Sequence, residues 1–114
     1  MLLRFIVVFT GISHFIYGIS ALFDPYSISE YTRYGFSQER IAIGVFQAVF
    51  GVILIGGLYF DKLKFLGASG LSLMMVGAFA TRVSIGDSII QSVPSVIYFL
   101  LNSIIIIKPL KTLK

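Results

Sequence analysis

The sequence contains no cysteine and a single histidine, His14. Thiol–disulfide exchange, iron–sulfur ligation, cysteine-based zinc sites and covalent haem attachment all require cysteine, so the sequence excludes them. One histidine cannot supply a bis-histidine haem site within a single chain, and alone it is a poor basis for a metal site. We therefore expect no metal, haem or iron–sulfur cofactor.

Charge is also scarce, because the 114 residues include only nine Lys and Arg and five Asp and Glu. Hydrophobic residues make up 57% of the chain, and its mean hydropathy is +0.96. This composition leaves too little polar surface to solvate a globular domain. The net charge of +4 is spread along the borders of apolar runs rather than gathered on one surface, so we expect no nucleic-acid partner.

Four apolar runs of about 20 residues lie between these charges. They are Leu2–Phe23, Ile41–Phe60, Leu63–Val83 and Ile89–Ile107. About 20 helical residues, at a rise of 1.5 Å each, cross the ~30 Å hydrocarbon core of a bilayer. The runs predict an all-α integral membrane protein, an antiparallel bundle of four transmembrane helices that forms one membrane domain over residues 1–114.

The first run has an alternative interpretation as a secretory signal peptide, because Arg4 precedes it and the small residues Ser20-Ala21 lie near its end. Its length is against this, since a signal-peptide apolar region is shorter. Its glycines and His14 also follow a pattern that suits helix packing. We therefore expect a retained span.

The basic residues indicate the orientation. Four spans place both termini on one side, and that side would carry Arg4, Lys62, Lys64, Lys108, Lys111 and Lys114. The other side would carry Arg33, Arg40 and Arg82. By the positive-inside rule both termini are cytoplasmic, and a bacterial inner membrane is the expected location. The C-terminal lysines would also favour anionic headgroups.

Residues 24–40 are the longest segment between the runs and are predicted to be an outer loop. Asp24-Pro25 ends the first span, because proline disfavours helix in the residue before it. The aromatic residues of this loop suit the headgroup level, so the loop should lie on the membrane. Ser37 is the expected N-cap of the second span, and Pro94 should kink the fourth.

Glycines recur seven residues apart in three of the runs. The pairs are Gly11 and Gly18, Gly44 and Gly51, and Gly70 and Gly77. Small residues at this spacing let helix backbones approach closely inside a membrane. The pairs therefore predict compact packing between the spans.

Polar residues inside a bilayer are costly and are candidates for function. The predicted ligand-binding residues are His14, Tyr17, Gln47, Arg82, Asp87 and Gln91, whereas Asn102 is expected nearer the cytoplasmic end. Gln47 should lie roughly 10 Å and His14 roughly 15 Å below the outer border. A pocket in the outer half would follow. The alternatives are a purely structural His14–Gln47 hydrogen bond, a helix-capping Asp87, and an Arg82 that reaches the interface and pairs with Asp87.

Two sequence patterns resemble the DoxX-like family of small four-span membrane proteins. The first is Tyr34-Gly35-Phe36 followed by Gly44-Val45-Phe46-Gln47-Ala48-Val49-Phe50-Gly51. The second is Thr81-Arg82-Val83-Ser84-Ile85-Gly86-Asp87-Ser88 with Gln91 and Pro94. Members of the family often have an acidic residue where Gln47 stands and a histidine or arginine near Arg82. The glutamine removes an ionisable group, which argues against a proton-linked role.

The resemblance implies two kinds of function. Some relatives look like subunits of membrane redox complexes that work with quinone or in oxidative stress, and a eukaryotic branch resembles assembly chaperones for ligand-gated channels. The leading hypothesis is an accessory subunit or assembly factor that binds a larger membrane protein, or itself as a homo-oligomer. The alternative is a quinone- or lipid-binding redox subunit. A small multidrug transporter is disfavoured, because the first span lacks the acidic residue that its mechanism requires.

Overall fold

The computed structural model describes residues 2–110, so Lys111 and Lys114 of the lysine-rich tail lie outside the described residues. Five helices account for nearly all of them. They are α1 (Leu2–Phe23), α2 (Pro25–Tyr34), α3 (Arg40–Gly56), α4 (Asp61–Ser84) and α5 (Ile89–Ile107). Residues 2–110 contain no strand. The predicted all-α class is confirmed.

Three of these helices, α1, α4 and α5, are long and apolar enough to cross a membrane. The second predicted span differs, because α3 is apolar but has only 17 residues. The chain then tightens into a turn with backbone hydrogen bonds between residues three apart, such as Gly57 N to Leu54 O at 2.9 Å. A Cβ on Gly57 would stand 2.4 Å from the Cα of Lys64, so the turn brings α3 directly against the start of α4.

The predicted outer loop is wrong in one respect, because it contains the helix α2. Asp24 caps α2 by accepting a hydrogen bond from the Ser27 backbone nitrogen at 3.1 Å. Pro25 occupies the first helical position, where its missing N–H costs nothing. The proline that stops the first helix thus starts the second. Gly35 ends α2 in the left-handed conformation, with φ of 85°.

The predicted capping role of Ser37 is also wrong. Residues 37–39 form a turn, and α3 begins only at Arg40. Arg40 ties this start to the end of α1, since its Nη1 donates to the carbonyl oxygens of Ala21 and Leu22 at 2.6 and 3.1 Å. A cation at the carboxyl end of a helix is favourable, because the last carbonyl groups lack helical partners.

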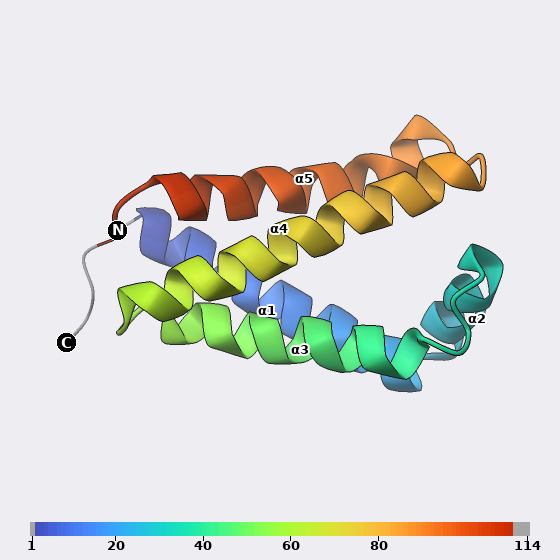
Figure 1. The fold of residues 1–114 in the computed structure, drawn as a ribbon, viewed down its shortest axis with the longest axis horizontal. Coiled ribbons are helices and arrows are strands. Elements are labelled where there is room, and N and C mark those ends of the chain that lie inside the picture. Colours follow the sequence, from blue (N-terminus) through green and yellow to red (C-terminus); the bar gives the residue numbers. More distant parts are fainter. Residues whose placement is uncertain (1, 111–114) are drawn as a thin grey trace.

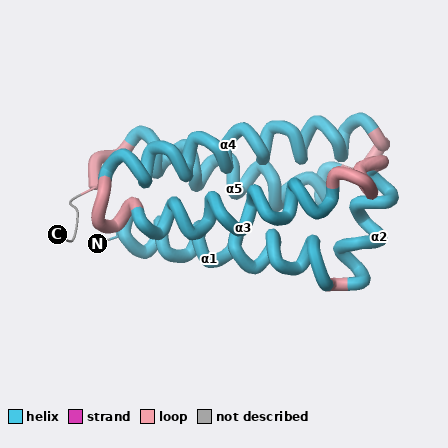
Figure 2. Tube along the Cα trace, turned by 60° about the horizontal axis from the view of Figure 1, so that its bottom comes forward, coloured by secondary structure: helices cyan, strands magenta, loops and turns pink. Residues whose placement is uncertain are grey.

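The four long helices lie side by side along the long axis of the molecule (Figure 1). Helices α1 and α4 run in one direction and α3 and α5 return, so α1 begins at the same end at which α5 finishes. Figure 2 shows α2 folded across the opposite end. The molecule measures 43 × 26 × 17 Å along its principal axes.

The close contact of α1 with α3 depends on glycine, as the seven-residue spacing predicts. A Cβ on Gly18 would stand 2.5 Å from both the Ala48 nitrogen and the Gly44 oxygen, and one on Gly51 would stand 2.6 Å from the Gly11 oxygen. Gly77 is different, since no atom of the described residues outside its chain neighbours and its own helix backbone lies within 4 Å of its Cβ position. The space beside Gly77 belongs to a cavity.

Candidate functional site

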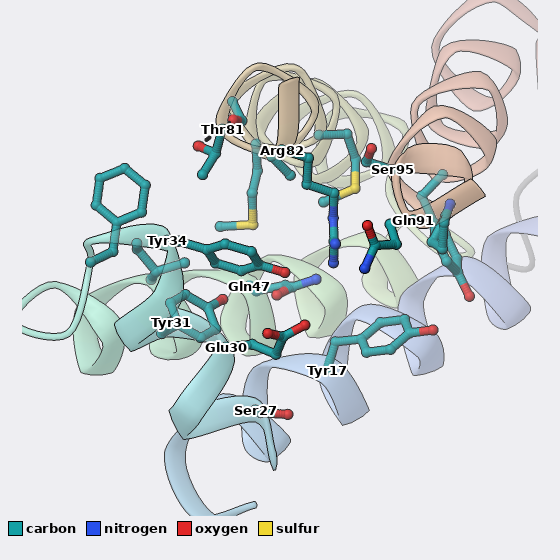
Figure 3. A pocket seen from close by; sticks show the side chains of 18 of the residues that line it. Tyr17, Ser27, Glu30, Tyr31, Tyr34, Gln47, Thr81, Arg82, Gln91 and Ser95 are labelled. Atoms are coloured by element: carbon teal, nitrogen blue, oxygen red, sulfur yellow. Dashed lines mark hydrogen bonds between the residues drawn. The ribbon is translucent and has the colours of Figure 1, made fainter. Parts of the chain in front are cut away.

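A cavity of about 600 Å³ lies between α2 and the neighbouring parts of the other four helices (Figure 3). Five of the six predicted ligand-binding residues line it, namely His14, Tyr17, Gln47, Arg82 and Gln91. Asp87 is not among the described residues that line the cavity, but it binds Arg82 at the mouth. The structure thus gathers residues from α1, α3, α4 and α5 around one space.

The sequence analysis missed the contribution of α2. Its residues Ser27, Glu30, Tyr31 and Tyr34 line the cavity. Their spacing of three, four and seven positions puts them on one face of a helix. That spacing was the available signal, and interpreting the segment as a loop concealed it.

The deep part of the cavity holds a hydrogen-bonded cluster centred on His14, which is fully buried. The side-chain amide of Gln47 lies 2.9 Å from His14 Nδ1, and Asn102 Nδ2 lies 3.2 Å from His14 Nε2. The His14–Gln47 hydrogen bond anticipated as a structural alternative is therefore present. Asn102 was expected apart from this group, but the packing of α5 against α1 brings it to the other side of the imidazole.

The mouth of the cavity is held by an ion-pair cluster. The Asp87 carboxylate accepts from Arg33 Nη1 and Nη2 at 2.6 and 3.1 Å, and from Arg82 Nη1 at 3.0 Å. Arg33 also donates through Nε to Glu30 at 2.7 Å. The Arg82–Asp87 pair predicted from the sequence is confirmed. Two cations and two anions balance each other here, so the cluster carries no net charge.

These contacts set the protonation of the two carboxyl groups. The hydrogen bonds from Arg33 hold the pKa of Asp87 below its ordinary value. The hydrogen bonds that Arg33 donates to Glu30 likewise lower the pKa of Glu30. Burial has the opposite effect on the phenols of α2 and raises the pKa of both Tyr31 and Tyr34. At neutral pH the carboxyl groups are therefore charged and the phenols are neutral.

Asp87 is not the helix cap that the sequence analysis allowed. Ser88 caps α5 by accepting from the Gln91 nitrogen at 3.3 Å, while the Gln91 side-chain oxygen accepts from the Ser88 nitrogen at 3.0 Å. This reciprocal arrangement satisfies two free donors at the start of the helix. It leaves Asp87 available for the arginines and fixes the Gln91 side chain at the cavity wall.

Aromatic rings form much of the remaining wall. Tyr98 meets the rings of His14 and Tyr17 edge-on, with centroids 5.1 and 5.7 Å apart. Tyr34 lies under both Arg33 and Arg82, with each guanidinium carbon 5.2 Å from the ring centroid. Such cation–π contacts hold the ring in place. Pro94 and Ile90, which lies one helical turn before it, also line the cavity. Because proline has no N–H, it cannot donate the helical hydrogen bond to the Ile90 carbonyl.

Apolar helices around a cavity with a few polar groups near one end are typical of a small integral membrane protein. Residues 1–105 match the model of the DoxX-like family, and the chain belongs to that family. The resemblance noted in the sequence is thus confirmed over most of the chain. Searches of the curated proteins and of the solved structures each found no match.

Proposed function

We propose that this protein binds a small, mostly apolar molecule with a carbonyl group, of the quinone class, in the cavity between α2 and the bundle. The observation that carries the proposal is the buried His14–Gln47–Asn102 cluster at the inner end of a cavity with aromatic and aliphatic walls. A volume of about 600 Å³ lies within the usual range for ligand pockets. Apolar walls with a few fixed polar groups are the usual composition of such sites.

The proposal includes an orientation in the membrane. In it α1, α3, α4 and α5 each cross the bilayer as an antiparallel four-span bundle, a single membrane domain. The start of α1 and the end of α5 face the cytoplasm of a bacterial inner membrane. The distribution of lysine and arginine supports this orientation. Helix α2 then lies at the outer surface, and the ligand enters from the outer leaflet.

Quinone binding can be measured directly on protein in lipid nanodiscs, with a short-chain ubiquinone as the probe and empty nanodiscs as the blank. Gln47→Leu removes a polar group that a carbonyl would meet, and Gly77→Leu fills space beside the cavity. We expect each to weaken binding by about tenfold or more. Gly77→Ala is the matched control and should retain most of the affinity. Unchanged quinone binding in both Gln47→Leu and Gly77→Leu would contradict the proposed site.

An accessory role beside a larger membrane protein stays a proposal, and purification in a mild detergent tests it. Mass spectrometry of the undissociated sample detects proteins and small molecules together. A stoichiometric protein partner would support the role of subunit or assembly factor. A quinone bound to this chain alone would support an independent binding protein, and a recovered dimer would support a homo-oligomer.

A further inference from the structure

The contacts of Asn102 favour one of the two orientations of its amide, in which Oδ1 is buried with no hydrogen-bond partner among the described residues. Its nitrogen Nδ2 donates to the Tyr98 carbonyl oxygen at 2.8 Å and lies 3.2 Å from His14 Nε2. Turning the amide over would place its oxygen against the Tyr98 oxygen, where neither group can donate. The nitrogen therefore faces both groups. One of its hydrogens goes to Tyr98 and the other points at the imidazole.

This orientation determines which nitrogen of His14 carries the proton. An amide nitrogen only donates, so His14 Nε2 must accept and carries no hydrogen. In a neutral imidazole the other nitrogen, Nδ1, then carries the proton, because the tautomer follows the hydrogen bond made by the partner nitrogen. His14 is thus a donor toward Gln47.

The proton on Nδ1 in turn orients Gln47. With Gln47 Nε2 at 2.9 Å from Nδ1, two N–H groups would face each other and form no hydrogen bond. A half-turn of the amide keeps its shape and brings Oε1 to the histidine. The Gln47 NH₂ group then turns toward the cavity that this residue lines.

We propose that Asn102 is a positioning residue that acts through His14 to make Gln47 present an N–H to the cavity. The site consequently takes a molecule whose hydrogen-bond acceptor, a carbonyl oxygen, reaches Gln47. Asn102 itself is fully buried and is not among the described residues that line the cavity. The ligand part of this inference rests on the proposed function, whereas the tautomer of His14 does not.

The tautomer can be measured without any ligand. His14 is the single histidine, so protein labelled with ¹⁵N-histidine gives the ring signals of one residue only. Protonated and unprotonated ring nitrogens have well-separated ¹⁵N chemical shifts. We expect a protonated Nδ1 and an unprotonated Nε2 in the wild-type protein. A proton on Nε2 in the wild-type spectrum overturns the inference, and this result needs no variant to fold.

Asn102→Asp tests the role of Asn102 with nearly the same shape. A protonated carboxyl group donates its hydrogen to Tyr98 and leaves a lone pair toward His14, and an ionised carboxylate can only accept. In both cases Nε2 gains a proton, and its ¹⁵N signal should move to the protonated position. Ser103→Ala is the control, because that neighbouring hydroxyl donates to the Phe99 carbonyl at 2.8 Å and should leave the His14 signals in place. An unmoved Nε2 signal in a folded Asn102→Asp protein contradicts the positioning role.

The ligand part is tested with two probes that differ by one carbonyl oxygen, α-tetralone and tetralin, in nanodiscs. We expect wild-type protein to prefer α-tetralone by about tenfold, beyond the difference in partition into empty discs. The preference should disappear in Gln47→Leu and shrink in Asn102→Leu, where nothing fixes the tautomer. Equal binding of both probes to the wild type overturns the assigned acceptor. If neither probe binds but the tautomer is as expected, the proposed function fails and the positioning role stands.

Discussion

Gly18 and Gly77 lie in opposite surroundings, which gives a matched test of packing. A Cβ on Gly18 would stand 2.5 Å from two backbone atoms of α3, which cannot move aside as a flexible side chain can. We expect Gly18→Ala to destabilise the fold by about 1–3 kcal/mol. Gly77→Ala meets open space and should be neutral or stabilise by up to about 1 kcal/mol, because alanine favours helix. Thermal unfolding in a mild detergent compares the two, and equal losses would contradict this account.

Thr10 gives a second test at the scale of one residue. Its hydroxyl is buried and has no hydrogen-bond partner among the described residues. Leaving such a group unpaired costs about 1–3 kcal/mol. Thr10→Val has nearly the same shape and removes the hydroxyl, so we expect the unfolding temperature to rise. A lower temperature would show that the hydroxyl has a partner in the membrane.

The sequence identified individual residues better than it identified their partners. Seven-residue spacing was enough to find Gly18 and Gly51, because a helix repeats its face every two turns. Asp87 pairs with Arg82, as predicted, but it also pairs with Arg33, which lies 54 positions away. No local pattern indicates a pair at that distance. Ser88 and Asp87 are both good capping residues, so only the geometry of α5 could distinguish them.

At the scale of the element, α2 is attached to the α4–α5 turn mainly through Asp87. We expect Asp87→Asn to loosen α2, since it removes the charge that Arg33 and Arg82 share. Faster amide hydrogen exchange confined to α2 would show the effect. Asp61→Asn is the matched control, because the Asp61 side chain is 73% exposed and its ion pair with Lys64 is long, at 3.7 Å. Similar exchange in both variants would contradict the attachment.

Acid should loosen α2 in the same way. The ion pairs lower the pKa of Asp87 from its ordinary value of 3.8 and that of Glu30 from 4.5. At any pH above these ordinary pKa values the ion pairs therefore stabilise the docked helix fully. That stabilisation is lost as pH falls through the lowered pKa values. Exchange of the α2 amides, corrected for the intrinsic pH dependence, should therefore be constant near neutrality and rise only below about pH 4. The rise should be absent in Asp87→Asn combined with Glu30→Gln.

Helix α2 could not be recognised from its hydrophobicity alone, because it is short and its surface is mixed. A ten-residue helix is marginal in isolation. It forms here because Asp24 caps it, Pro25 starts it and Arg33 anchors it. Two of those signals were in the sequence, but Pro25 was interpreted as an end rather than a start. The long apolar helices were predicted close to their observed bounds, except that α3 ends at Gly56 rather than at Phe60.

At the scale of the whole molecule, the lack of cysteine makes the orientation easy to measure. Single cysteines can be placed at two exposed sites, Ser29 in α2 and Lys62 near the start of α4. We expect a membrane-impermeant maleimide to label Ser29→Cys in intact bacterial spheroplasts and Lys62→Cys only after lysis. Labelling of Lys62→Cys alone in intact spheroplasts would indicate the opposite orientation. Labelling of both variants in intact spheroplasts would contradict a single fixed orientation.

The lengths of the apolar runs predicted an all-helical fold, but they could not predict the cavity. Cavity walls come from all five helices, and their meeting depends on the docking of α2 and on the space that Gly77 leaves. The candidate residues were nevertheless recognisable, because a polar group inside an apolar run is rare and needs a reason. Asn102 was expected farther from His14 than it is, because the position of a residue along one helix does not indicate which residue of a neighbouring helix it contacts.

The long dimension of the molecule, 43 Å, is close to the full thickness of a bilayer with its headgroups, about 40–45 Å. In the proposed orientation, with this axis across the membrane, residues 2–110 would project almost no mass into the aqueous phase on either side. Proteases and antibodies would meet little beyond α2 and the short turns, so the folded chain should survive digestion of intact membranes. Recognition by another protein would then take place largely within the lipid, helix against helix, where close packing by small residues replaces the hydrophobic effect.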